Sequence, residues 1–414
     1  MICIFQGKEL IMQEEKEMLK DRIAKQLREC ICVEKEDRDT IIGLPYPYSV
    51  PTEGNKFHEL YYWDTYFTNL GLICTGALEQ AKNNVDDMLY LIERYGFMPN
   101  GSRTFYLNRS QPPFLSIMVR DIFDETQDET WLAGAYETLK KEYDFWMNQR
   151  TFENGLAHYG YTPTDPTVEK YADSWVKRTG VTADIDRMEL AGNFIAQAES
   201  GWDFNARLGV RGQYAMSPDL NSLLWALENN MAYFASALNN DEVTGWRARA
   251  ARRKQSIDTL LWRDREGFFA DVDAENGETS PIFSAAAFYP MFVGIADIWQ
   301  AERLWEKLPL LEHPYGVCPC APHTAEGRFQ WDAPNVWPCL QWIVYKALKN
   351  YGYNEDAERI AQKYVRLVES VEAQTGQLWE KYNADSGDCD VTNEYTMPPM
   401  MGWTAGVYLK FLCR

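Results

Sequence analysis

Apolar residues recur at intervals of three and four positions over most of the chain, which is the periodicity of helices that bury one face. Strand-like alternation of apolar and polar residues is confined to short runs such as Gly267–Asp273. We therefore predict an all-α fold. The helical pattern recurs in paired segments, which cover residues 12–30, 76–95, 131–149, 219–238, 241–262, 283–307, 338–352 and 355–371.

Stretches rich in Gly, Pro and Asn separate these segments, and no Ser/Gly-rich linker divides the chain into two halves. With 414 residues, of which 46% are hydrophobic, the chain is long enough to bury one large core. We predict one catalytic domain over residues 44–414, with a helical segment at residues 1–43 packed on it. A site is expected in the loops above such a scaffold, and these are residues 44–56, 96–113, 151–187, 200–218, 308–337 and 374–398.

Tryptophan is followed directly by a carboxylate four times, in or beside these loops: Trp63-Asp64, Trp202-Asp203, Trp331-Asp332 and Trp379-Glu380. A sugar ring has an apolar C–H face that stacks on an indole and hydroxyl groups that hydrogen-bond to carboxylates. Cleavage of a glycosidic bond also requires two carboxyl groups, one as acid and one as base or nucleophile. The pattern therefore indicates a carbohydrate site.

The net charge of −20 argues against a nucleic-acid partner, because phosphates would be repelled over most of the surface. It suits a small neutral ligand and a monomer or small homo-oligomer. No segment approaches the ~18 uninterrupted apolar residues of a membrane span, so no membrane partner is expected. Residues 1–8 lack the basic and apolar regions of a secretory leader, and we expect a cytoplasmic location.

The nine cysteines are scattered and odd in number, which is typical of reduced thiols rather than of a disulfide framework. One short stretch holds four residues that are able to ligate zinc, namely His313, Cys318, Cys320 and His323. Its Cys-x-Cys spacing differs from the usual Cys-x2-Cys knuckle, and the stretch is rich in proline. We predict no metal site and no organic cofactor.

Several motifs in a fixed order resemble the trehalase family of inverting glycoside hydrolases. Residues 57–66 (FHELYYWDTY) resemble the first signature of that family, and residues 330–337 (QWDAPNVW) resemble the second closely. The remaining matches follow the order of the family and are residues 99–101 (PNG), 109–113 (RSQPP), 200–204 (SGWDF) and 380–382 (EKY). The resemblance covers roughly residues 44–412 and implies an (α/α)6 toroid whose inter-helix loops form the pocket.

The resemblance assigns the general acid to Asp203 and the general base to Glu380. Chemistry favours the same assignment, because Trp202 and Phe204 flank Asp203 and would desolvate it, which raises a carboxyl pKa. Lys381 beside Glu380 would keep the base ionised. Inverting enzymes hold the two carboxyl groups about 6.5–9.5 Å apart, with a water molecule between them. Taken singly, Asp203 is also a candidate helix cap, and Glu380 a candidate solvated surface acid.

The resemblance further implies a set of substrate-binding residues: Lys56, Phe57, Trp63, Asp64, Asn100, Arg109, Gln111, Gly201, Trp331 and Asp332. Alternatives remain open for three of them. Asp64 and Asp332 are also candidate helix caps, and Arg109 is a candidate for an internal ion pair. Trp337 and Trp403 are expected to be core aromatics rather than direct ligands.

Two departures from the family fall where the leaving-group sugar would bind. Residues 54–57 read GNKF where the family carries Gly-Gly-Arg-Phe, and residues 171–175 read YADSW where it carries Arg-Pro-Glu-Ser-Trp. Lys56 and Tyr171 therefore replace arginines, and lysine lacks the planar donor fork of arginine. The glycine-rich lid of the family is also reduced to residues 385–393. We expect the leaving-group subsite to be altered and more open.

The sequence thus predicts an inverting α-glycoside hydrolase that acts on α,α-trehalose. The nearest alternative is the same chemistry on another α-glucoside or α-mannoside, such as glucosylglycerate or mannosylglycerate. A sugar epimerase on the same toroid is disfavoured, because such enzymes depend on histidines and no Trp-acid motif contains one of the four: His58, His158, His313 and His323. A non-catalytic sugar-binding protein is disfavoured because both carboxylates are present.

Overall fold

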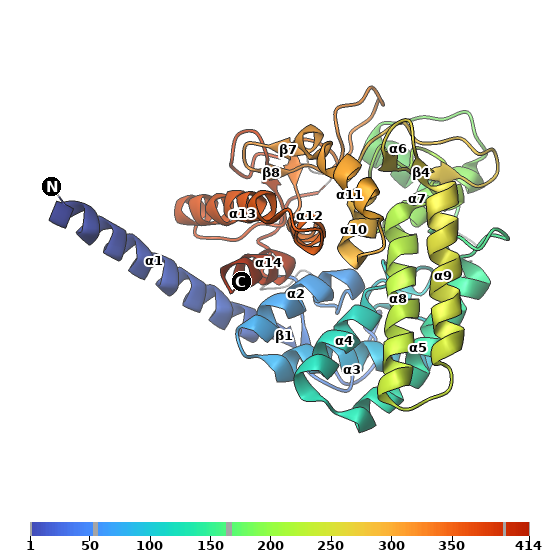
Figure 1. Ribbon diagram of the computed structural model, residues 1–414, viewed down its shortest axis with the longest axis horizontal. Helices are drawn as coiled ribbons and strands as arrows, with labels where there is room; N and C mark the ends of the chain where they lie inside the picture. Colours follow the sequence, from blue (N-terminus) through green and yellow to red (C-terminus); the bar gives the residue numbers. More distant parts are fainter. Residues whose placement is uncertain (1, 53–56, 163–167, 392–394, 414) are drawn as a thin grey trace.

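A computed structural model describes residues 2–52, 57–162, 168–391 and 395–413 of the chain (Figure 1). Helices dominate it, and they alternate along the chain between an outer and an inner position. No helix in these ranges is long and apolar enough to cross a membrane.

The inner helices form a closed ring in which each packs against the next and the last packs against the first. Side chains that face the centre of the ring are buried. In the helix that begins at Tyr62, for example, ten residues are buried. The ring consists of α2 (Tyr62–Cys74), α4 (Leu115–Thr126), α8 (Pro218–Ala237), α10 (Tyr289–Val293), α12 (Pro338–Asn350) and α14 (Gly402–Leu412).

The outer helices precede or follow their inner partners and cover the ring, as α9 and α13 do in Figure 1. They are α1 (Ile2–Glu29), α3 (Leu78–Tyr95), α5 (Glu129–Gln149), α9 (Val243–Leu260), α11 (Ile298–Trp305) and α13 (Asn354–Thr375). In α3, α5 and α13 the buried residues recur mainly at intervals of three and four positions, the pattern that the periodicity predicts. The prediction of an all-α (α/α)6 toroid is confirmed.

Two further helices, α6 (Lys170–Thr179) and α7 (Arg187–Glu199), form a hairpin between α5 and α8. The first lies where the sequence predicted only a loop. Conversely, the single helix expected at 283–307 is divided into α10 and α11, because Gly294 adopts a φ of 83° at the C-terminal end of α10.

Short antiparallel strand pairs tie the connecting loops together. The pairs are β1 (Ile31–Cys32) with β2 (Tyr48–Ser49), β3 (Ala215–Met216) with β6 (Val272–Asp273), β4 (Trp262–Arg263) with β5 (Phe268–Phe269), β7 (Glu312–His313) with β8 (Gly316–Val317), and β9 (Asn335–Val336) with β10 (Tyr382–Asn383). Single 3-10 turns occupy Thr104–Tyr106, Gly212–Tyr214, Ala285–Phe288 and Leu308–Leu310.

The C-terminal part of α1 contacts α2 and α14, whereas its N-terminal part extends away from the body (Figure 1). The β1–β2 pair then joins residue 31 to residue 49, on either side of the proposed domain boundary. A boundary at residue 43 stays a prediction.

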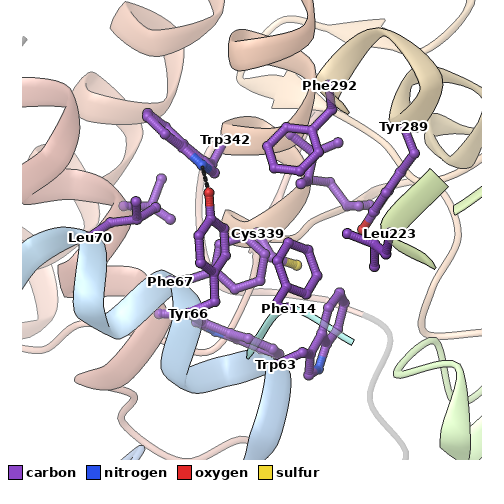
Figure 2. Packing of buried hydrophobic residues seen from close by; sticks show 14 of the residues in the cluster. Trp63, Tyr66, Phe67, Leu70, Phe114, Leu223, Tyr289, Phe292, Cys339 and Trp342 are labelled. Carbon is purple, nitrogen blue, oxygen red and sulfur yellow. Dashed lines mark hydrogen bonds between the residues drawn. The ribbon is translucent and has the colours of Figure 1, made fainter. Parts of the chain in front are cut away.

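Aromatic side chains fill the centre of the ring (Figure 2). The rings of Tyr66 and Phe114 stack with their centroids 4.6 Å apart. The Tyr66 hydroxyl accepts a hydrogen bond of 3.0 Å from the indole nitrogen of Trp342. This layer closes the channel of the toroid, so that a ligand enters only from a mouth of the ring.

The ring closes where α2 meets α14, at a contact between backbones. A Cβ atom placed on Gly406 would lie 2.0 Å from the carbonyl oxygen of Phe67, and one on Gly71 would lie 2.7 Å from the Cα of Gly406. Any side chain at either position would force the two helices apart.

We therefore expect Gly406→Ala to lower the free energy of unfolding by at least about 1–3 kcal/mol, the cost of overpacking a core. Chemical denaturation followed by circular dichroism measures this effect. Gly134→Ala is the matched control, because Gly134 lies in α5 and a Cβ atom placed on it would meet nothing within 4 Å. That control should gain about 0.5–1 kcal/mol. Equal stability changes in both variants would contradict the close packing of α2 on α14.

Candidate active site

A cavity of about 510 Å³ opens at the end of the ring where most inner helices begin. Trp63 and Asp64 lie in the first turn of α2, and Gln111 lies just before α4. Trp337 directly precedes α12, and Trp403 lies in the first turn of α14. Helix N-termini at this mouth bring partial positive charge toward the carboxylates in the cavity.

Most of the residues that the sequence predicted for the site line this one cavity, although they come from distant segments. They are Phe57, Trp63, Asp64, Asn100, Arg109, Gln111, Gly201, Asp203, Trp331 and Glu380. Lys56 lies outside the described residues. Asp332 is the exception among those that are described.

The side chain of Asp332 does not line the cavity. This corrects the prediction that Asp332 lies on the rim of the site. One of its carboxylate oxygens lies 2.7 Å from Nε2 of His323, and the other accepts a hydrogen bond of 2.8 Å from the backbone nitrogen of Ala333. Asp332 thus fixes the loop that carries Trp331 rather than facing a ligand.

Asp203 lies in the loop after α7, where no helix begins, so the interpretation as a helix cap does not fit. Its Oδ2 accepts a hydrogen bond of 3.2 Å from Nη2 of Arg178. Burial raises the pKa of Asp203, and the positive charges of Arg178 and Arg109 oppose this rise. The effect of burial is the larger, so the pKa of Asp203 lies above the usual range of an aspartate.

Glu380 is buried, which excludes a solvated surface acid. The Tyr395 hydroxyl donates to its Oε1 over 2.5 Å, and the ammonium of Lys381 donates to its Oε2 over 2.8 Å. Lys381 is itself fully buried, with Nζ 4.7 Å from the centre of the Trp337 ring. Both oxygens of the carboxylate thus accept a hydrogen bond from a neighbouring side chain.

Gln330 connects the segments of the two carboxyl groups. Its Nε2 donates to the backbone oxygen of Asp203 over 2.5 Å, and its Oε1 accepts from Lys381 over 3.4 Å. The β9–β10 pair reinforces this link, because Val336 pairs with Tyr382 two residues beyond Glu380. The two carboxyl groups are therefore held in one frame, although they are 177 positions apart.

Four indoles line the cavity, those of Trp63, Trp331, Trp337 and Trp403. Trp331 stacks on Trp337 with ring centroids 3.8 Å apart and planes 2° from parallel, and on Trp202 at 5.5 Å. Trp63 packs against Trp331 at 5.6 Å. Gly201 has a φ of 74°, and a Cβ there would lie 2.7 Å from the Trp63 ring. Glycine at this position is therefore required by both the backbone and the indole.

Arg109 reaches the cavity from the loop before α4. Its Nε donates to Oδ1 of Asn100 over 2.9 Å, and its Nη1 donates to Oδ1 of Asn108 over 3.0 Å. Its guanidinium also lies 4.9 Å from the centre of the Tyr106 ring. These partners are neutral, which does not fit an internal ion pair and leaves the positive charge available near Asp203.

Asp64 is the third carboxyl group of the cavity. Burial and then the charges of Glu380 and Asp203 raise its pKa to about 7. No side chain caps α2 at its N-terminus, so the interpretation of Asp64 as a cap does not fit. At neutral pH this carboxyl is able to donate as well as accept a hydrogen bond.

Helix α6 contributes residues that sequence reasoning missed: Ser174, Lys177 and Arg178 line the cavity. Their spacing of three and four positions places them on one helix face, a signal that was present in the sequence. Tyr171, the expected replacement of an arginine, lies outside the cavity lining and stacks on Phe194 at 5.2 Å. Gln330, Tyr61, Tyr106 and Tyr395 are further lining residues that were not singled out as ligands.

The histidines of the zinc-capable stretch make other contacts. His313 Nδ1 lies 2.7 Å from a carboxylate oxygen of Asp385, and His323 pairs with Asp332 as described above. Within the described part of the chain, no group of three or more metal-ligating side chains comes together.

Solved structures with the same fold include neutral trehalase Nth1 from Saccharomyces cerevisiae, with a TM-score of 0.76 and 27% identity over 89% of this chain and 73% of that one. Another is the GH63 mannosylglycerate hydrolase from Thermus thermophilus, with a TM-score of 0.65 and 16% identity over 95% of this chain and 99% of that one. The second likeness shows the fold alone.

Curated relatives include two periplasmic trehalases. The one from Xanthomonas axonopodis pv. citri is 35% identical over 90% of this chain and 69% of its own length. The one from Salmonella paratyphi B is 33% identical over 91% of this chain and 70% of its own length. Their names contradict the cytoplasmic location expected from the sequence. That expectation relied on the missing leader pattern, which says little because leaders are removed from mature chains.

The trehalase family model matches residues 6–414, which is nearly the whole chain. This range includes every motif on which the resemblance rested and every lining residue of the cavity. The chain is therefore a glycoside hydrolase that belongs to the trehalase family.

Proposed function

We propose that the protein hydrolyses α,α-trehalose with inversion, with Asp203 as general acid and Glu380 as general base. The observation that carries the proposal is that both carboxyl groups line one cavity together with stacked indoles and polar side chains. The names of the curated relatives, all trehalases, support the choice of substrate.

The acid must carry a proton to the glycosidic oxygen as the bond breaks. Burial favours the neutral form of Asp203, and Arg178 stabilises the carboxylate that forms once the proton has left. Because Arg178 lies beside the acid, it lies on the side of the leaving-group sugar. This guanidinium offers the planar donor array that the sequence suggested was lost at Lys56 and Tyr171.

The base must remain ionised and accept a proton from the attacking water. Lys381 and Tyr395 each donate a hydrogen bond to one oxygen of Glu380 and so fix the orientation of its carboxyl group. Asp64, Asn100 and Gln111 then remain to hydrogen-bond sugar hydroxyls, while Trp63 offers an apolar face.

The anomers released from trehalose test the mechanism. Attack by water on the opposite face converts the cleaved α-glucosyl ring to β-glucose, while the leaving ring departs as α-glucose. Proton NMR at early times should therefore show equal amounts of the two anomers. Two α-glucose molecules would indicate retention and overturn the assignment of Glu380 as a base. Failure to cleave trehalose, with cleavage of mannosylglycerate instead, would overturn the substrate.

Asp203→Asn and Glu380→Gln are each expected to lower kcat for trehalose by about 10²–10⁴-fold, because each removes a proton-transfer group. Circular dichroism should show an unchanged fold. Asp173→Asn is the control, since Asp173 is exposed on α6 and pairs with Arg187 away from the cavity. If either active-site variant kept more than a tenth of wild-type kcat, an effect below about 1.4 kcal/mol, its assigned role would be wrong.

Arg178→Gln is expected to move the alkaline limb of the kcat profile upward by roughly one pH unit. The reason is that Arg178 lowers the pKa of Asp203, so its removal leaves the acid protonated to higher pH. Arg178→Lys retains the charge and is the control, with a limb close to wild type. A rise in KM with no displacement of the limb would show that Arg178 only binds substrate.

A further inference from the structure

Two cysteine side chains meet where the ring closes. Cys74 is the last residue of α2, and Cys413 directly follows the last residue of α14. The Sγ atom of Cys413 lies 3.6 Å from the backbone oxygen of Cys74, although 339 positions separate the two residues in the chain. The spacing of the cysteines in the sequence, from which reduced thiols were predicted, cannot reveal a contact that only the closed ring creates.

The packing of α2 on α14 holds the two cysteines close together. Gly71, three positions before Cys74, lies directly against the backbone of Gly406. The Cys74 thiol donates to the backbone oxygen of Gly71 over 3.5 Å, so both sulfur atoms contact only main-chain oxygens of the same helix end. A disulfide requires Cβ atoms about 3.5–4.5 Å apart. Rotation of the two side chains, rather than movement of a helix, therefore brings the sulfur atoms together.

A small oxidant is able to reach this pair, because Cys413 is exposed and Cys74 is only half-buried. The surroundings are also positively charged. The charges of Lys20 and Lys410 act on the Cys74 thiol, and Nη1 of Arg28 donates to the backbone oxygen of Thr75 over 3.2 Å. Cysteines that are partly exposed among positive charges are the ones that react in proteins, because the thiolate is the reactive form.

The two thiols differ in readiness to react. Burial raises the pKa of Cys74, and the interaction with the Cys413 thiol adds to this rise, whereas Lys410 and Lys20 oppose it. Cys74 is therefore a poor first nucleophile, and the exposed Cys413 reacts first. Once Cys413 is bound in a mixed disulfide, its thiol no longer raises the pKa of Cys74.

We propose that oxidation joins Cys74 and Cys413 in a disulfide bond that links the first inner helix to the last. The Cys413 thiolate attacks one sulfur of a low-molecular-weight disulfide such as oxidised glutathione and releases a first thiol. The Cys74 thiolate then attacks Sγ of Cys413, and formation of the new bond releases a second thiol. The two cysteines lose two electrons and two protons, which reduce the added disulfide to two thiols.

This bond would secure the closure of the ring at the mouth opposite the active site. Cys74 ends α2, whereas Trp63 and Asp64 lie in the first turn of the same helix. In the chain-entropy account, a disulfide stabilises by restricting the unfolded chain, and the effect grows with the length of the enclosed loop. Here the loop spans residues 74–413. The oxidised protein should therefore unfold at a higher temperature, with unchanged kcat/KM for trehalose.

Peptide mapping tests the bond on the full chain. The protein is incubated with oxidised glutathione, its free thiols are blocked with N-ethylmaleimide, and the species of monomer mass is digested with trypsin without reduction. Residues 57–82 and 411–414, the tryptic peptides that contain Cys74 and Cys413, should be recovered joined to each other. Recovery of the two peptides unlinked, with or without a glutathione adduct on Cys413, would overturn the proposal.

Thermal unfolding followed by circular dichroism is the second measurement. Oxidised wild type should have a Tm a few °C above that of protein kept in dithiothreitol. Cys413→Ser, at an exposed position, should abolish this difference. Cys32→Ser is the matched control and should retain it, because Cys32 is a half-buried cysteine on β1, away from the α2–α14 contact. Equal differences in wild type and Cys413→Ser would also overturn the proposal.

Discussion

The architecture depends on the contact between the first and last inner helices, where two backbones meet without a side chain between them. Gly71 and Gly406 allow this approach, and it closes a ring whose members are more than three hundred positions apart in the chain. A closed ring has two mouths and no free edge. Every loop of the active site is anchored to one of these helices, so the positions of the loops relative to each other are set by this closure.

The helices that the sequence revealed are mostly those with one apolar and one polar face. The outer helices α3, α5, α9 and α13 match predicted segments, because solvent on one side imposes a period of 3.6 residues. The inner helices α2, α4 and α14 were not recognised by periodicity. Helices α2 and α14 are buried on nearly all sides, as the run from Thr65 to Leu72 shows, and a helix without a polar face has no amphipathic signal. Helix α4 has an exposed polar face, so its pattern was present in the sequence and was not recognised.

The candidate site was predictable where its residues stand in short motifs of unusual composition, as Asp203 and Glu380 do. Residues that enter the cavity from α6 were missed, and Arg178 is the main example. Their spacing of three and four positions was present in the sequence, just beyond the match at residues 171–175, but no helix was predicted there. Asp332 belongs to a motif but binds His323, so adjacency to Trp331 in sequence did not put both side chains in the cavity. A side-chain contact such as that between Asp332 and His323 arises from tertiary packing and leaves no pattern in the sequence.

Gln330 has a role that a search for charged residues would pass over. Its amide joins the backbone of the proposed acid to the lysine that holds the proposed base. An amide does not titrate, whereas the proposed mechanism has the carboxyl groups on either side of it change protonation in every catalytic cycle. In that mechanism the amide keeps its hydrogen bonds while the charges beside it change, so the spacing of the two carboxyl groups would be independent of the proposed proton transfers.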